Sequence, residues 1–387
     1  MLFRRRNVLR TGLAAGLAAS FAPSLRAQSD AIKVGAVLPF SGGLELFGEQ
    51  AKLGIDLAVA EINAAGGVLG QPMEVLYEDN RTDPKTSVEV MQKLVRGDDV
   101  IAVTGPITSN ARDAMASQIA RLQRPLLYAT NYEGGACDPF IFCFNTVPNQ
   151  ELQRLIPYLI ANKGTSFYMF GADYVWPQKM FEFAERQIAD LGGTVAGKEF
   201  TPWGVKEFTP VIRRMAESEA EVLLFALPGA DGITFVRQAE DLGLLEQLTV
   251  GFLGFSEAYL GAFGDGKAQD MYVAVPLVAS SDAPSVQDFV ARVRANAGNE
   301  ATVSHYVLTH YNAIRALAQG LEAAGEISPE AAATGMAGLE VDSPTGPVTI
   351  GEADHHVTLS MFLARTEGAG LVTVEDIGEI APEAGCA

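Results

Sequence analysis

Several features that common protein classes require are scarce or missing in this chain. Three cysteines and four histidines among 387 residues are too few for a disulfide framework, and none has metal-ligand company at a useful spacing, so no metal is predicted. The 28 Lys and Arg residues are outnumbered by 47 Asp and Glu, which gives a formal net charge of -19. A surface this acidic repels nucleic acid and anionic lipid, so neither is expected as a partner. No G-x-G-x-x-G or P-loop pattern occurs, which leaves a nucleotide-dependent enzyme without support and predicts no cofactor.

The first 27 residues indicate export from the cytoplasm. Arg5-Arg6 lies in a basic opening that resembles the bacterial twin-arginine pattern, an uncharged run covers 11–21, and Ala27 ends a cleavage approach. That run is too short and too rich in Ala and Gly to anchor the chain, and no later segment is long and apolar enough to span a bilayer. We expect a cleaved signal peptide over 1–27 and a periplasmic location, with the twin-arginine route favoured and general secretion as the alternative.

The remaining chain alternates between short β-rich runs and helical patterns. A buried strand is predicted at 32–38, apolar positions then recur at helical spacing through 51–62, and a second series begins near Pro148. Strands that alternate with helices form parallel sheets covered on both faces, so the pattern predicts an α/β protein with two doubly wound parallel-sheet lobes. We expect the chain to return to its first lobe and to end in the second. The predicted division assigns 31–147 and 276–342 to lobe 1, 148–275 and 343–375 to lobe 2, and 376–387 to a tail.

Polar and aromatic residues gather where strands of the first lobe end, which is where open parallel sheets bind ligands. Ser109 follows a strand and enters a helix, so its hydroxyl and the free N–H groups beside it suit a carbonyl or carboxylate oxygen. An ordinary N-cap is the alternative for Ser109. The next strand ends in a run of phenol, hydroxyl and amide groups that includes Tyr128, Thr130 and Asn131.

Similar residues follow the strands of the second lobe. Tyr174 and Trp176 stand two residues apart just before a proline that can open a helix, and we interpret them as aromatic walls that close over a small ligand. Core packing is the alternative for both aromatics. Asp231 and Glu257 add two carboxylates, which either cap helices and face solvent or, if buried, need N–H donors that a ligand amide or ammonium supplies.

The three cysteines leave their pairing open. Cys137 and Cys143 enclose a short acidic loop and could pair in an oxidising periplasm, and two unpaired thiols are the alternative. Cys386 lies in a tail rich in Pro, Gly and Ala, which we expect to be disordered.

Short motifs spread over almost the full mature length carry a family resemblance. They are Pro-Phe-Ser-Gly at 39–42, Glu-Ile-Asn-Ala-Ala-Gly-Gly-Val-Leu-Gly at 61–70, Tyr-Glu-Gly at 132–134, Pro-Asn-Gln at 148–150, Asp-Tyr-Val-Trp-Pro at 173–177, Ser-Glu-Ala at 256–258 and Ser-Pro-x-Gly-Pro at 343–347. In this order they resemble a type I periplasmic solute-binding protein of the ABC-importer class, nearest the amide- and urea-binding branch.

The resemblance implies two lobes, joined by three crossings, that close on a solute by hinge motion and deliver it to a membrane permease and ATPase pair. It also implies that Ser109, Tyr128 and Thr130 meet the ligand from lobe 1, that Tyr174 and Trp176 close from lobe 2, and that Phe47 stands where amino-acid binders often place a Tyr.

Three positions bear on which solute the resemblance implies. Trp176 stands where Tyr or Phe is more usual, and Asn131 stands where amide binders can carry Pro. Branched-chain amino-acid binders place a Glu near Glu257 for the ammonium group. We therefore expect a small polar solute such as urea or a short-chain amide, with a branched-chain or other amino acid as the alternative.

Two other functions are alternatives to solute capture. An exported serine hydrolase would use Ser256 with Asp342 and either His355 or His356, in the chain order of that class. The segment 254–258 misses the G-x-S-x-G elbow by its last residue, and the helix expected after the Ser is broken, so we predict no enzyme. A ligand-sensing regulator of the same fold would work in the cytoplasm, which the export signal argues against.

Overall fold

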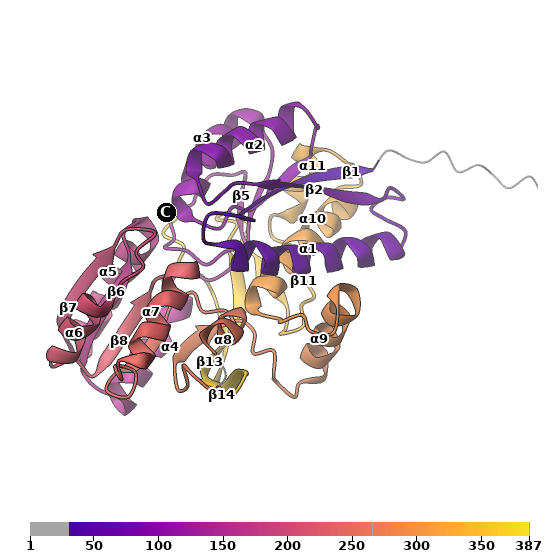
Figure 1. Ribbon diagram of the computed structural model, residues 1–387. Helices are drawn as coiled ribbons and strands as arrows, with labels where there is room; N and C mark the ends of the chain where they lie inside the picture. The colour runs from indigo at the N-terminus through magenta and orange to yellow at the C-terminus, as the bar shows by residue number, and fades with distance from the viewer. Residues whose placement is uncertain (1–30, 265, 387) are drawn as a thin grey trace, which may run out of the picture.

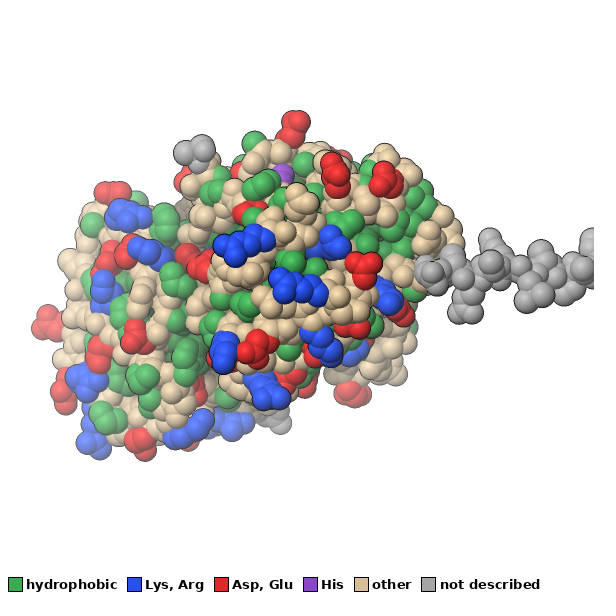
Figure 2. All heavy atoms as spheres, turned by 90° about the horizontal axis from the view of Figure 1, so that it is seen from above, with side chains coloured by type: hydrophobic (Ala, Val, Ile, Leu, Met, Phe, Trp, Pro, Cys, Tyr) green, Lys and Arg blue, Asp and Glu red, His purple; other side chains and the backbone are tan. Residues whose placement is uncertain are grey.

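The computed structural model describes residues 31–264 and 266–386, so the expected signal peptide lies outside the described residues. Two α/β lobes lie side by side, each a twisted sheet with helices packed against it (Figure 1). The predicted fold class is confirmed. None of the helices within this part of the chain is long and apolar enough to cross a membrane. Acidic and basic side chains are interspersed over the face shown in Figure 2, as expected of a solvated surface.

Lobe 1 is built on a five-stranded parallel sheet in the order β2-β1-β3-β4-β5. β1 lies inside the sheet between β2 and β3 and is almost wholly buried, as a strand covered on both faces should be. The strands are β1 Ile32–Leu38, β2 Met73–Asp79, β3 Ala102–Thr104, β4 Leu126–Tyr128 and β5 Ile141–Cys143. Between them run α1 Glu45–Ala64, α2 Pro84–Arg96 and α3 Ser109–Leu122.

Lobe 2 is built on a nine-stranded sheet in the order β11-β12-β13-β10-β9-β8-β6-β7, with β14 paired to β13. Its parallel part comprises β6 Ser166–Ala172, β7 Thr194–Thr201, β8 Val222–Ala226, β9 Thr249–Phe252 and β10 Tyr272–Val275. An antiparallel part follows at the end of the chain with β11 Glu340–Val341, β12 Val348–Ile350, β13 Val357–Glu367 and β14 Gly370–Ile380. Its helices are α4 Pro148–Asn162, α5 Val175–Asp190, α6 Thr209–Glu217, α7 Gly229–Asp241 and α8 Ala258–Phe263.

The chain visits the lobes alternately. After β10 it forms α9 Pro284–Ala297, α10 His305–Ala324 and α11 Pro329–Met336, and α9 and α10 pack on α1 of lobe 1. It then finishes in the sheet of lobe 2. The predicted tail at 376–387 begins too early, because β14 stays paired with β13 as far as Ile380.

The disulfide joins Cys137 to Cys386, so the structure shows neither of the two alternatives considered for Cys137 and Cys143, a bond between them or two unpaired thiols. Cys143 ends β5 and is buried as a free thiol, whereas Cys137 lies in an exposed loop. We expected the tail to be disordered, but it is ordered. The Gly135 N–H donates to the Ala384 carbonyl at 2.7 Å. These contacts attach the end of the chain, which leaves lobe 2 at β14, to a loop of lobe 1.

Candidate functional site

A cavity lies between the two lobes at the carboxyl ends of their strands, where open α/β sheets bind ligands. The cavity is small, with a volume of about 20 Å³. Residues from both lobes line it: Leu44, Phe47, Ile107, Ser109, Thr130, Asn131 and Tyr306 from lobe 1, and Tyr174, Trp176, Pro228 and Gly254 from lobe 2.

The lobes touch each other beside this cavity. The Ala230 N–H, at the start of α7, donates to the Gly43 carbonyl of lobe 1 at 2.9 Å. Gly229 permits this approach, because its φ is +71° and a Cβ there would stand 2.3 Å from the Gly43 oxygen. The Phe47 ring also meets the Tyr259 ring of lobe 2 edge to face, with centroids 5.8 Å apart. The structure therefore has the lobes closed.

Aromatic side chains form most of the cavity wall. Phe47 and Tyr306 pack edge to face with ring centroids 4.9 Å apart, and both are almost fully buried. Tyr174 lies between Trp176 inside the cavity and Trp203 at the surface, at centroid distances of 6.3 and 5.4 Å. Such rings offer a small solute a large apolar contact area at a low cost in side-chain entropy.

Unpaired hydrogen-bonding groups accompany these rings. The Trp176 Nε1, the Asn131 Nδ2 and the Thr130 Oγ1 are buried without a partner among the described residues. The other end of the Asn131 amide is fixed, because its Oδ1 accepts from the Tyr306 hydroxyl at 2.7 Å. A buried donor left unpaired costs about 1–3 kcal/mol. Three such groups on one cavity indicate that a bound molecule completes them.

The structure brings several of the predicted site residues together around this one cavity. They are Phe47, Ser109, Thr130, Asn131, Tyr174 and Trp176. That they contact the solute stays a prediction. Ser109 begins α3 as expected, but its hydroxyl donates to the Glu133 carboxylate at 2.7 Å.

Tyr128, Asp231 and Glu257, which were also predicted to contact the ligand, are not among the residues that line the cavity. Tyr128 is fully buried in lobe 1, and its hydroxyl donates to the Ile107 carbonyl at 2.9 Å. Asp231 instead holds the loop after β7, because its Oδ2 accepts from the Gly204 N–H at 2.6 Å. The sequence places these groups at strand ends but does not say to which side each side chain turns.

Tyr306 and Glu133 contribute to the site although the sequence did not single out either as a site residue. Tyr306 lies in the first turn of α10, a helix that is buried nearly all round, so its helical pattern gives no sign of a cavity-facing position. Glu133 belongs to the Tyr-Glu-Gly motif that supports the family resemblance, and that motif was the available signal.

Comparison with known proteins identifies the family. The model of the family described as "Periplasmic binding protein" matches residues 31–370. The chain belongs to this family. It is similar to the Leu/Ile/Val-binding protein BraC3 of Rhizobium johnstonii, with 28% identity over 94% of this chain and 99% of the relative. It is also similar to the leucine-, isoleucine-, valine-, threonine- and alanine-binding protein of Pseudomonas aeruginosa, with 24% identity over 86% of this chain and 89% of the relative.

Solved structures share the fold of this periplasmic binding protein. A solute-binding protein of an ABC transporter from R. palustris, in complex with 4-hydroxybenzoate, has a TM-score of 0.82 at 23% identity and covers 92% of this chain and 98% of its own. A branched-chain amino acid transporter substrate-binding protein from Streptococcus pneumoniae, in complex with isoleucine, has a TM-score of 0.80 at 21% identity over 90% and 99% of the two chains. These relatives are binding proteins, and this chain is one too rather than an enzyme.

The geometry agrees that Ser256 is no nucleophile. The Ser256 hydroxyl is fully buried and accepts from the Ala258 N–H at 3.3 Å. Both ring nitrogens of His356 are engaged elsewhere, Nε2 with the Tyr132 hydroxyl and Nδ1 with the Asp354 carbonyl. His355 stacks on a phenylalanine ring of β5. Since neither imidazole engages Ser256, the predicted alternative of a serine triad is not formed.

Two buried carboxyl groups lie near the cavity without lining it. Burial raises the pKa of Glu257 to about 8, and neither of its carboxylate oxygens has a side-chain partner in the described structure. Burial also raises the pKa of Glu151 to about 7, although its Oε1 accepts from the Thr146 hydroxyl at 2.6 Å. The folded protein therefore keeps protons on these groups that the unfolded chain releases near pH 4.5.

Stability should fall as pH rises from about 6.5 to 8, by about 2 kcal/mol from these two groups together. The sign follows because the folded state holds more protons than the unfolded state up to the raised pKa values of Glu151 and Glu257, about 7 and 8. Buried His305 and His310, with pKa values lowered by burial to about 3 and 4, act in the opposite direction only below about pH 6.5. Urea unfolding at pH 6.5 and 8 should show this slope.

The double variant Glu151→Gln, Glu257→Gln is the comparison for that slope, because the amides keep the shape of the side chains and do not titrate. It should lose most of the pH dependence above pH 6.5. An unchanged slope in the double variant would show that other groups are responsible.

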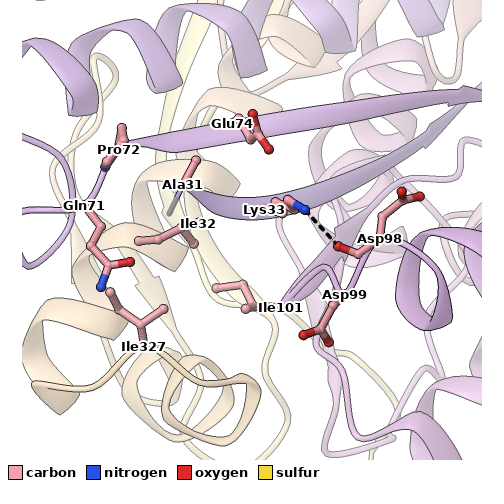
Figure 3. Close-up of a pocket in the computed structure, with 10 residues that line it drawn as sticks. All are labelled: Ala31, Ile32, Lys33, Gln71, Pro72, Glu74, Asp98, Asp99, Ile101 and Ile327. Atoms are coloured by element: carbon pink, nitrogen blue, oxygen red, sulfur yellow. Dashed lines mark hydrogen bonds between the residues drawn. The ribbon is translucent and has the colours of Figure 1, made fainter. Parts of the chain in front are cut away.

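Another pocket lies at the opposite end of the lobe 1 sheet (Figure 3). It surrounds the start of β1, with the Lys33 ammonium donating to the Asp98 carbonyl at 3.4 Å. Open parallel sheets bind ligands beyond the carboxyl ends of their strands rather than at this end, so the interlobe cavity remains the candidate site.

Proposed function

We propose that this protein is the exported solute-binding component of an ABC importer, and that it captures a small amide or urea-type solute between its lobes. The permease and its ATPase would recognise the closed, solute-bound conformation and receive the solute from it. The solute-binding proteins of transporters that share its fold support this role. Cleavage after Ala27 and a periplasmic location are part of the same proposal.

The observation that carries the amide assignment is the chemistry of the cavity lining. No residue that lines the cavity bears a formal charge, yet the Trp176 Nε1 and the Asn131 Nδ2 are buried donors without partners. A neutral carbonyl oxygen satisfies such donors without the desolvation cost that a full charge would carry. The apolar part of the solute would pack against Phe47 and Tyr306.

A branched-chain amino acid is the second candidate. The names of the similar Rhizobium and Pseudomonas proteins favour it. The two unpaired carboxylate oxygens of Glu257 favour it as well, because an ammonium group would satisfy them if Glu257 turned toward the solute.

Two measurements separate these candidates. Mass spectrometry of the small molecules released on denaturing the purified protein should identify a retained amide or urea. Thermal unfolding with acetamide, isobutyramide, urea, L-leucine, L-isoleucine, benzoate and 4-hydroxybenzoate should show stabilisation by the amides, by about 2.7 kcal/mol at 100 times the Kd. Stabilisation by leucine and isoleucine alone would favour the second candidate, and stabilisation only by benzoates would contradict both.

A further inference from the structure

Ser109 lines the cavity, and the proton of its hydroxyl group is already committed. Its Oγ donates to the Glu133 Oε2 at 2.7 Å on the protein side. A serine hydroxyl has one proton and two lone pairs. With the proton held by Glu133, only lone pairs remain for a solute.

Arg112 forms an ion pair with the Glu133 carboxylate that accepts this proton. The Arg112 Nη2 pairs with the Glu133 Oε1 at 3.0 Å, and the side chains are only 3% and 7% exposed. A guanidinium is always protonated in proteins, and an ionised carboxylate can only accept hydrogen bonds. The Arg112 side chain is itself held between two phenol rings, with its Cζ 5.0 Å from the Tyr128 centroid and 4.3 Å from the Tyr132 centroid.

The neighbouring phenol does not supply Ser109 with a proton that would change this pattern. The Tyr128 hydroxyl donates to the Ile107 carbonyl at 2.9 Å, so it offers Ser109 only lone pairs. Toward Ser109, the side chains of Glu133 and Tyr128 thus both act as acceptors. The Ser109 proton therefore stays on the protein side.

We propose that Glu133, held by Arg112, is a specificity-determining residue that makes Ser109 an obligate hydrogen-bond acceptor, so that the site selects solutes with an N–H donor at this point. The inference rests on the proposed function and narrows it. A solute that places an oxygen acceptor against the Ser109 Oγ cannot form a hydrogen bond there, because neither oxygen has a proton to donate. Together with the Trp176 and Asn131 donors, Ser109 then recognises both halves of an amide group.

Isobutyramide and isobutyrate test this, because they have nearly the same shape and differ at one position by a neutral NH2 group or an ionised oxygen, and the Asp113→Asn control below accounts for the difference in charge. We expect the wild-type protein to bind isobutyramide at least about tenfold more tightly, which is the value of one hydrogen bond to a charge-polarised partner. In Glu133→Gln the new amide can donate to the Ser109 Oγ and free its proton for the solute. Isobutyramide should then bind more weakly and isobutyrate more tightly, which lowers the preference about tenfold. A merely structural role would weaken both.

Asp113→Asn is the matched control. Asp113 is the second carboxylate on Arg112, at 2.7 Å, but it is 58% exposed, and its replacement removes the same charge without touching the Ser109–Glu133 bond. The preference of Asp113→Asn for isobutyramide over isobutyrate should stay within about twofold of the wild-type value. An equal shift in Asp113→Asn would make the effect one of charge and overturn the proposal.

Other binding results also test the role of Glu133. An unchanged preference in a folded Glu133→Gln protein overturns the inference and leaves the proposed function standing, whereas a wild-type preference for isobutyrate overturns both. If Glu133→Gln does not fold, Ser109→Ala replaces it and should lose the preference for isobutyramide without gaining affinity for isobutyrate. Binding of neither probe to the wild-type protein overturns the amide assignment, and the inference with it.

Discussion

Replacing Trp176 with alanine should weaken solute binding at least about 100-fold, because the change removes both a wall and a donor from the cavity. Trp176 is 4% exposed, and its Nε1 has no partner among the described side chains. Truncating a buried aromatic that anchors a ligand typically costs at least about 2 kcal/mol of binding free energy, and the lost hydrogen bond adds about 1 kcal/mol. Calorimetric titration with the solute that is released from the purified protein measures the effect.

Two further variants make this result specific. Trp203→Ala removes the same type of side chain from the same lobe, but Trp203 is 39% exposed and does not line the cavity, so its affinity should stay within about threefold. Trp176→Phe keeps a ring and removes only the N–H, and we expect a loss of about tenfold. Equal affinities for Trp176→Ala and Trp203→Ala would place the solute elsewhere.

Breaking the disulfide should cost about 2–4 kcal/mol of stability, because the bond joins residues 249 positions apart and restrains the unfolded chain strongly. Cys386→Ser should therefore unfold at a clearly lower urea concentration than the wild-type protein. A reductant should lower the stability of the wild-type protein to about that of Cys386→Ser and leave the variant unchanged. Urea unfolding with and without dithiothreitol measures both effects.

The third cysteine provides the control for this prediction. Cys143→Ala removes the buried free thiol and leaves the bond from Cys137 to Cys386 in place, so this variant should stay sensitive to the reductant. Loss of reductant sensitivity in Cys143→Ala, with sensitivity kept in Cys386→Ser, would mean that Cys137 pairs with Cys143 instead. Peptide mapping without reduction would identify the bond directly.

Because the tail lies on lobe 1, the disulfide also bears on how the lobes move. β14 belongs to the sheet of lobe 2, whereas Cys137 follows β4 of lobe 1. Further bonds hold the tail along this path: the Glu383 N–H donates to the Asn149 side chain at 2.8 Å and the Gly135 N–H to the Ala384 carbonyl at 2.7 Å. Any opening of the cleft must therefore keep this attachment intact or bend the tail.

The sequence by itself determined the architecture. Buried β-rich runs that alternate with helical patterns predict parallel sheets from local physics alone, since each pattern reflects which faces of its own segment are covered. The same reasoning put candidate residues at strand ends, and five of them line the cavity, including Ser109, Thr130 and Trp176. This works because the carboxyl ends of parallel strands meet at one edge whatever the remaining packing.

Only the tertiary structure decided which partner each side chain meets. The hydroxyl of Tyr306 reaches Asn131 across 175 residues of sequence, and Cys137 reaches its partner across 249. Tyr128 and Asp231 stand at strand ends as predicted, yet one turns into the core and the other holds a loop. Side-chain direction and distant partners depend on how separate segments pack together, and a local pattern carries no record of that packing. The wall, the unpaired donors and the fixed proton of Ser109 therefore became visible only in the folded protein.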